Sequence, residues 1–188
     1  MKQLYLVLSA IFFTSIGFAQ LPGVGIRGGI NVAKYGGEVG SLESAVGINI
    51  GVDLNLPLGP SFSLQPEVAY SEMGAKGGGG MSQKLSYIAI PVLGKYEFVG
   101  SGFSLYAGPQ IGILTGAKMK SAAGSINIKE VFNTTDVAAV LGLEFKIPVT
   151  SLFVSARYQF GLTDIDKDDA KLTNNGATLL LGWRFGGK

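Results

Sequence analysis

Apolar and polar residues alternate with a period of two along most of this chain. In the clearest window, branched aliphatic residues occupy every second position from Val46 to Leu56, with small or polar residues between them. Alternation of this length predicts a β-strand with one apolar face. The same pattern, in stronger or weaker form, predicts eight strands, over 23–33, 45–56, 62–71, 85–98, 103–115, 136–147, 151–163 and 176–186. No window after Gln20 is typical of an amphipathic helix.

The lengths of these windows and of their connectors indicate a membrane barrel. A tilted strand needs about 9–11 residues to cross a bilayer, and each window provides this length. Short connectors at 57–61, 99–102 and 148–150 alternate with long ones at 34–44, 72–84, 116–135 and 164–175. Short periplasmic turns and longer external loops are typical of outer-membrane barrels. We therefore expect an all-β, eight-stranded antiparallel up-and-down transmembrane barrel.

The first residues of the chain have the features of a secretory signal. A positive start at Lys2 is followed by an apolar run over 4–13 and by small residues before Ala19. This three-part pattern predicts a signal peptide over 1–19 and a mature barrel domain over 20–188. The alternative is an uncleaved anchor, but the apolar run is shorter than the ~20 residues of a spanning helix.

Alternation alone does not decide which face of the barrel is apolar, so a soluble lipocalin-like barrel that binds an apolar ligand is the alternative. Charged residues make up only 15% of the chain, whereas a solvated exterior would carry more Lys and Glu. Aromatic residues on the apolar face also fall near the strand ends, as expected for membrane interfaces. We therefore expect the apolar face to contact outer-membrane lipid. These aromatic residues are Phe62, Phe98, Phe103, Phe145, Trp183 and Phe185 at the periplasmic ends, and Tyr70 and Phe160 near the other rim.

The opposite face then lines a narrow lumen, and its charged residues lie near the periplasmic ends of the strands. They are Arg27, Asp53, Glu67, Lys95, Glu97, Glu144, Lys146, Arg157 and Arg184. Because unpaired charges in a confined space are costly, we expect these side chains to pair and plug the barrel. Glu67 and Arg157 are each expected to join this network. The outer half of the lumen is expected to hold Gly, Ser, Asn and Tyr-like residues with Gln110 and Gln159. The alternative is a narrow gated path for small solutes.

Composition excludes several other functions. With 15 Lys+Arg against 13 Asp+Glu, the chain lacks the basic excess of a nucleic-acid binder. It has no Cys and no His, which removes thiolate metal sites and His-based catalytic triads. The glycines from Gly23 to Gly28 resemble a dinucleotide motif without its preceding strand or following helix. We expect no cofactor, no metal site and no enzymatic activity.

The acidic connector 164–175 partly matches a calcium-binding loop. It departs from that pattern at Asp169, where a Gly is required, and at Asn175, where a Glu is required. We therefore interpret it as an exposed acidic loop, with adventitious cation binding as the alternative.

Several strand sequences resemble the PorT-like outer-membrane beta-barrel family. The resemblance is carried by 25–31 (GIRGGIN), 64–71 (LQPEVAYS), 87–93 (YIAIPVL), 106–109 (YAGP) and 157–165 (RYQFGLTDI), and it covers 20–186. It implies an eight-stranded barrel like the OmpA- and OmpX-type barrels, in the Gram-negative outer membrane. Some members are linked to protein secretion. The family supplies no catalytic residues. Its implied partner is an envelope or secretion-machinery protein that contacts the external loops.

Overall fold

The structure is a computed structural model, and it describes residues 22–37, 43–77, 80–121, 124–167 and 172–186. The predicted signal peptide, 1–19, lies outside the described residues. The described elements are β1 (Gly23–Gly37), β2 (Glu43–Pro57), β3 (Phe62–Lys76), β4 (Ser82–Glu97), β5 (Phe103–Ser121), β6 (Gly124–Asn127), η2 (Lys129–Val131), β7 (Thr135–Lys146), β8 (Leu152–Gly161) and β9 (Leu172–Gly186). No helix in the described part of the chain is long and apolar enough to span a membrane.

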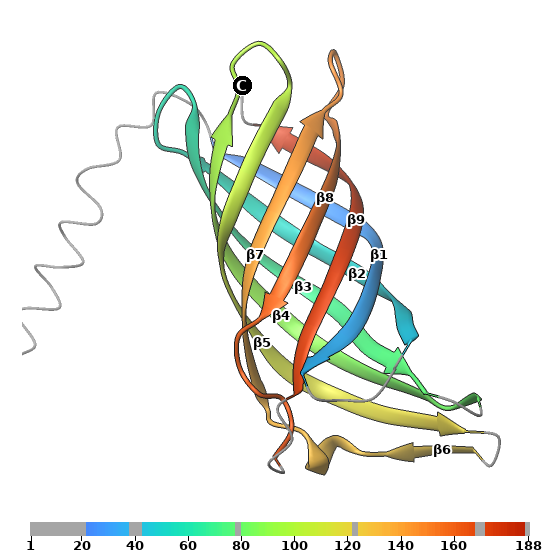
Figure 1. Cartoon of the computed structure of the whole chain (residues 1–188). Helices are drawn as coiled ribbons and strands as arrows, with labels where there is room; N and C mark the ends of the chain where they lie inside the picture. The colour runs from blue at the N-terminus through green and yellow to red at the C-terminus, as the bar shows by residue number, and fades with distance from the viewer. Residues whose placement is uncertain (1–21, 38–42, 78–79, 122–123, 168–171, 187–188) are drawn as a thin grey trace, which may run out of the picture.

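Eight of the strands form a closed antiparallel barrel, which confirms the predicted fold (Figure 1). Each barrel strand pairs with its neighbours in the chain, so the topology is up-and-down. The first and last strands, β1 and β9, pair over their whole length, from Gly23 with Gly186 to Gly37 with Leu172. This pairing closes the barrel and leaves no free edge among its eight strands.

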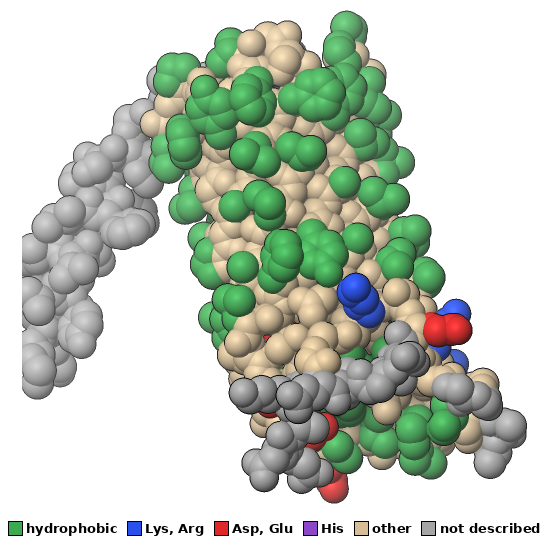
Figure 2. Space-filling view, viewed as in Figure 1, with side chains coloured by type: hydrophobic (Ala, Val, Ile, Leu, Met, Phe, Trp, Pro, Cys, Tyr) green, Lys and Arg blue, Asp and Glu red, His purple; other side chains and the backbone are tan. Residues whose placement is uncertain are grey.

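The exterior of the barrel is apolar (Figure 2), and most of its aromatic residues lie toward the end that carries the short turns. Outward aliphatic side chains such as Ile50 and Leu181 are more than half exposed. At the short-turn end, the ring centroids of Phe103 and Phe145 lie 4.6 Å apart, and those of Trp183 and Phe185 lie 6.4 Å apart. An aliphatic band with aromatic residues at its rim suits a lipid interface. The soluble-barrel alternative requires the opposite arrangement and is wrong.

Most strands extend further at the long-loop end than the alternation predicted, although β8 ends at Gly161, within its predicted window. β5 continues to Ser121, and the short strand β6 pairs back onto it within the connector predicted as a loop over 116–135. Register shifts occur between Ser44 and Asn49 and between Ser86 and Tyr87. The extensions lie beyond the apolar exterior, where pairing no longer requires one apolar face. The alternation of apolar and polar residues therefore stops before the strands end.

Candidate functional site

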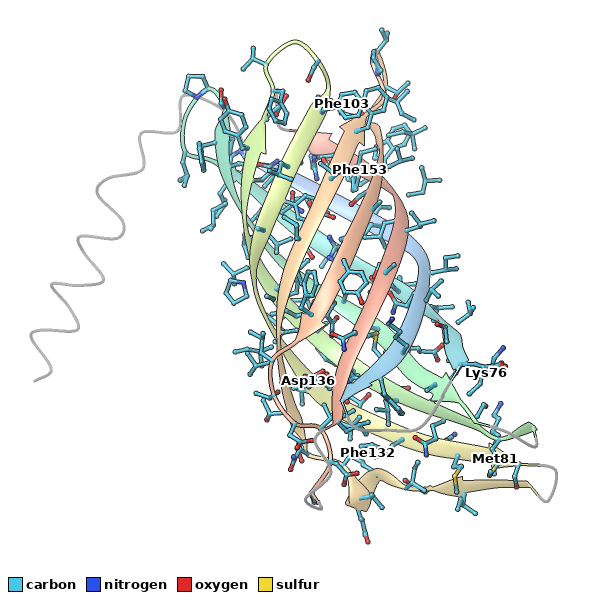
Figure 3. The ribbon with its side chains drawn as sticks, viewed as in Figure 1. Lys76, Met81, Phe103, Phe132, Asp136 and Phe153 are labelled. Carbon is cyan, nitrogen blue, oxygen red and sulfur yellow. The ribbon has the colours of Figure 1, made fainter. Side chains whose placement is uncertain are left out.

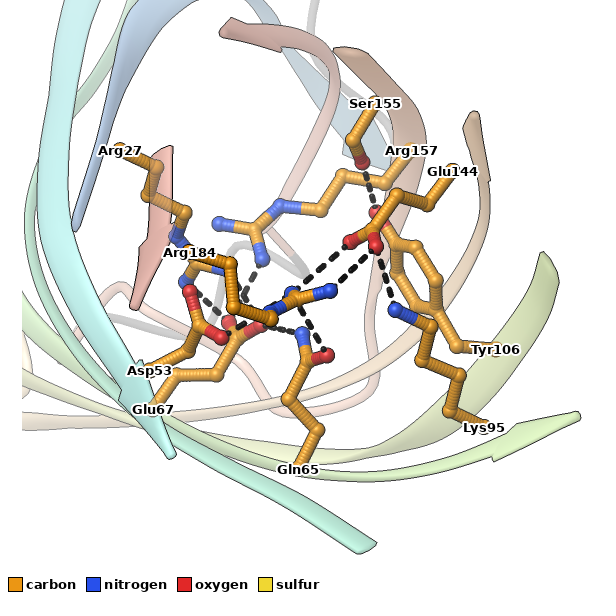
Figure 4. Close-up of polar contacts among 10 residues, drawn as sticks. All are labelled: Arg27, Asp53, Gln65, Glu67, Lys95, Tyr106, Glu144, Ser155, Arg157 and Arg184. Carbon is orange, nitrogen blue, oxygen red and sulfur yellow. Dashed lines mark hydrogen bonds and ion pairs between the residues drawn. The ribbon is translucent and has the colours of Figure 1, made fainter. Parts of the chain in front are cut away.

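The lumen near the short-turn end is filled by a network of buried charges (Figure 4). Glu67 on β3 is one of its two centres. Its carboxylate accepts two hydrogen bonds from the guanidinium of Arg27, and a third from Arg157 Nη1 at 2.8 Å. Gln65 Nε2 donates a fourth at 2.8 Å. Two guanidinium groups therefore share one carboxylate that is shut off from solvent.

Glu144 on β7 is the second centre of the network. Its carboxylate accepts a hydrogen bond from Lys95 Nζ and another from Arg184 Nη1, the latter at 2.8 Å. The same Arg184 reaches back toward the first centre, since its Nη2 donates to Asp53 Oδ1 at 3.2 Å and to Gln65 Oε1 at 3.4 Å. Arg184 thus connects the two centres across the lumen.

All eight barrel strands contribute at least one side chain to this layer. β5 supplies Tyr106, whose hydroxyl hydrogen-bonds the hydroxyl of Ser155. The other seven strands supply charged residues, four bases and three acids, and six of these seven residues are buried. Arg184 is the exception, but only 10% of its side chain is exposed. Buried charges are tolerated when paired, and these pairs span the barrel. The seven are Arg27, Asp53, Glu67, Lys95, Glu144, Arg157 and Arg184.

Two residues expected in the lumen do not lie there. Glu97 and Lys146 are both exposed, at the final positions of β4 and β7. Neither takes part in an ion pair with another described residue. The prediction for these two residues is wrong, because the alternation places them on the inward side without showing that the strands end at the rim.

Glycines leave the space that this layer of long side chains needs. A Cβ atom on Gly142 would lie 2.5 Å from the ring of Tyr106, and one on Gly182 would lie 2.2 Å from the ring of Phe153. The ring of Phe153 in turn stacks under the guanidinium of Arg184, 4.5 Å from ring centroid to Cζ. The high glycine content therefore reflects, in part, a narrow lumen packed with large groups.

A neutral polar layer follows toward the long-loop end. Asn31 Nδ2 donates to Ser71 Oγ at 2.9 Å, and Thr178 Oγ1 donates to Asn31 Oδ1 at 2.8 Å. Gln110 Nε2 donates to Gln159 Oε1 at 2.8 Å. These side chains are buried and hydrogen-bonded to one another, so they form a second layer that fills the lumen.

The outer part of the lumen is mainly apolar, which corrects the expectation of small and polar residues there. Leu85, Tyr87 and Leu114 pack in one buried cluster with Phe132 and Ile165, which come from the external connectors. Asn174 Nδ2 bonds both Asp136 Oδ2 and Tyr87 Oη, each at 3.0 Å. Figure 3 shows Asp136 and Phe132 at this end of the barrel, opposite Phe103 and Phe153. The cluster caps the closed lumen.

The external connectors contact each other and form an ordered surface above this cap. Asn133 Nδ2 donates to the carbonyl oxygens of Asp164 and Asp166 at 3.0 and 2.8 Å. Lys167 Nζ donates to the carbonyl oxygen of Glu130 at 2.8 Å. In these three hydrogen bonds between the connectors 116–135 and 164–175, the acceptor is a backbone carbonyl oxygen.

An external pocket of about 340 Å³ lies in this surface. Tyr35 on β1, Met119 on β5 and Leu172 on β9 line it together with Val131 and Phe132. The buried hydroxyl of Tyr35 has no hydrogen-bond partner among the described residues. Sequence reasoning missed this pocket because its walls come from five separate segments with no shared motif.

The described residues contain no group of three or more Asp and Glu side chains arranged to bind a metal ion. Asp164 Oδ1 instead accepts hydrogen bonds from the backbone N–H of Asp166 and Leu172, at 3.1 and 3.0 Å. Asp169, which counted against a calcium loop, lies outside the described residues. The glycines from Gly23 to Gly28 lie within β1, where no phosphate-binding turn is formed.

Solved structures with the same fold are outer-membrane proteins. The Ail attachment invasion locus protein of Yersinia pestis, in complex with the heparin analogue sucrose octasulfate, is 19% identical with a TM-score of 0.57. That match covers 87% of this chain and 99% of Ail. Neisserial surface protein A is 14% identical with a TM-score of 0.61, over 86% of this chain and 97% of that protein. At these low identities, the TM-scores show a shared fold alone.

No curated protein matches this sequence. The family of outer membrane protein beta-barrel domains does match it, over residues 18–167. That range contains β1 to β8, including six of the seven charged residues of the lumen network. Together with the lipid-facing exterior and the closed barrel, this match shows that the chain is an outer-membrane protein that belongs to the outer membrane protein beta-barrel domain family.

Proposed function

We propose that this chain is a non-enzymatic outer-membrane protein that recognises an envelope protein partner through its external end. The observation that carries the proposal is the contrast between the two ends of the lumen. Near the periplasm the lumen is closed by buried ion pairs, whereas the external end presents a pocket above an apolar cap.

The closed lumen argues against transport as the main role. A solute passing through would have to separate Glu67 from Arg157 and Glu144 from Arg184. Breaking one buried ion pair costs about 3–5 kcal/mol, because charges are left unpaired in a confined space. An eight-stranded barrel also leaves room for little beyond its own side chains. The barrel therefore suits a rigid support better than a pore.

The external pocket suits an apolar side chain of a protein partner. Its walls at Met119, Val131 and Phe132 are apolar, and 45% of the apolar residue Val131 is exposed to water. Loops held on a rigid scaffold are common recognition sites. The resemblance to the PorT-like family makes a component of protein secretion the partner that we propose.

Single cysteines test this role, because the chain has none of its own. Val131→Cys should form one defined cross-linked product with an envelope protein in intact cells. Val149→Cys, in the exposed turn at the opposite end, should not form it. The purified partner should then bind the purified barrel, and Met119→Lys in the pocket should abolish that binding. Equal amounts of the cross-linked product from both cysteine variants would contradict the proposal, as would partner binding that Met119→Lys leaves unchanged.

Conductance provides a separate test. We expect the purified barrel in a planar bilayer to give no discrete conductance steps. Reproducible steps would instead support the narrow-channel alternative, and Glu67→Gln should then alter their size.

A further inference from the structure

Three strands at the external end carry matched polar side chains on one face. Lys118 on β5 is directly opposite Lys84 on β4 and Asn127 on β6. Lys120 is likewise opposite a serine on each neighbouring strand. Directly paired residues in an antiparallel sheet place their side chains on the same face. We call this group the lysine face; it consists of Ser82, Lys84, Lys118, Lys120, Ser125 and Asn127. On the neighbouring strand β3, Lys76 lies opposite Ser82 and Glu72 lies opposite Ser86.

The lysine face points away from the lumen. The alternate residues Gln83 and Met119 line the external pocket, so their neighbours in sequence point outward. Nearer the middle of the barrel, the outward positions of β5 are the exposed residues Ile111 and Ile113. The bulge at Thr115, opposite Ser86 and Tyr87, shifts the register, so that the even-numbered residues of β5 face outward beyond it. The lysine face therefore continues the lipid-facing surface beyond its apolar band.

Most of the positive charge on this face is not neutralised by the protein. Like charges directly opposite each other destabilise a strand pair. Lys84 Nζ bonds Glu72 Oε2 at 2.8 Å, and Glu72 also accepts a hydrogen bond from the hydroxyl of Tyr70 at 3.1 Å. Lys118 and Lys120 form no ion pair with any other described residue. Two exposed ammonium groups thus lie beside a third, and an anion between them would relieve their repulsion.

We propose that the lysine face binds the phosphate group of a lipid headgroup in the outer leaflet. A phosphomonoester carries a charge of about −1.5 to −2 at pH 7 and three strong acceptor oxygens. The ammonium groups of Lys118 and Lys120, which have no carboxylate partner among the described residues, match that charge. Serine hydroxyls and the amide of Asn127 supply further donors. Lysine is a common phosphate binder with a flexible stem, so three of them can converge on one group.

The position of the lysine face favours a lipid over a soluble anion. A lipid whose acyl chains lie against Ile111 and Ile113 places its headgroup next to Lys118 on the same surface. The apolar contacts and the phosphate contacts then act together. This inference concerns the lipid-facing side of the barrel, and it goes beyond the proposed recognition of a protein partner at the pocket.

Lipid titration with native mass spectrometry tests the inference on the folded full-length barrel in detergent. The probes are bis-phosphorylated lipid A, the same lipid without its phosphates, and inorganic phosphate. We expect Lys118→Gln/Lys120→Gln to weaken binding of the phosphorylated lipid by about tenfold or more, since charge-assisted hydrogen bonds are lost. Removing the phosphates from the lipid should have a similar effect on the unmodified protein.

A matched pair of lysines provides the control. Lys34 is exposed on β1 at the same end of the barrel, and Lys146 is exposed at the other end. Lys34→Gln/Lys146→Gln changes the net charge equally and should leave lipid affinity within about twofold, because neither residue belongs to the lysine face. Equal weakening by both double variants would overturn the inference, as would equal affinity for the two lipids. Inorganic phosphate that binds as tightly as the phosphorylated lipid would overturn the assignment to a lipid. A heat-dependent gel shift verifies that each variant is folded.

Discussion

Replacing Glu67 with Gln removes the charge on which half of the lumen network depends. The side chain keeps its shape, but two buried guanidinium groups, those of Arg27 and Arg157, lose their shared carboxylate. Removing one partner of a buried ion pair typically costs about 3–5 kcal/mol. With a urea dependence of about 2 kcal/mol per M, the unfolding midpoint should fall by about 2 M.

Equilibrium unfolding in lipid vesicles measures this effect. Trp183 is the only tryptophan of the chain, and it lies on the outward face of β9 with 42% of its surface exposed. Its emission should therefore report the transfer of this strand from lipid to water. Glu97→Gln is the matched control, since this exposed carboxylate lies at the rim and its replacement should change stability by less than about 0.5 kcal/mol.

The reasoning is refuted if the midpoint of Glu67→Gln falls no further than that of Glu97→Gln. A double variant gives a second check on the cause. Glu67→Gln/Arg157→Gln also removes one of the two guanidinium groups left without a carboxylate. The free energy of unfolding that it loses should therefore be smaller than the sum of the losses in the two single variants. Strict additivity would mean that the two side chains do not interact.

Two further substitutions test the packing of the lumen and the order of the external surface. Gly142→Val should lower the unfolding free energy by about 1–3 kcal/mol in the same assay, because its side chain would overlap the ring of Tyr106. Gly94→Ala, where an added Cβ has no neighbour closer than 3.8 Å, is its control. Asn133→Ala removes two hydrogen bonds to the connector at Asp166, and should speed proteolysis of the external surface without shifting the urea midpoint. Unchanged cleavage rates would show that those bonds do not order the connector.

The sequence was most informative where the bilayer constrains the chain. Lipid satisfies no backbone hydrogen bonds, so each spanning segment must be a paired strand with one apolar face. The windows that contain Val46 and Leu181 therefore showed both the strands and their outward faces, and the structure confirms the barrel that they predict.

The alternation was less informative outside the apolar band. There strands such as β6 are held by pairing with a neighbour, and nothing requires one face to be apolar. The bulge at Thr115 also changes which residues of β5 face outward, and a single sequence does not reveal such a shift. The alternation likewise predicts a polar outer lumen and a loop at Phe132, whereas both Leu114 and Phe132 belong to one buried apolar cluster.

The placement of the lumen charges determines the register of the strands, which the alternation leaves open. Each barrel strand supplies at least one member of the layer at a similar height, so the contacts form only when all strands are in register. A slip of two residues in the closing pair of β1 and β9 would move Arg27 by about 6.6 Å relative to Arg184, while the apolar faces would remain outward. Alternation cannot distinguish that slipped barrel from the native one. The charged layer can, because a slip would leave buried guanidinium groups unpaired, and the cost of unpaired charges therefore selects one register of closure.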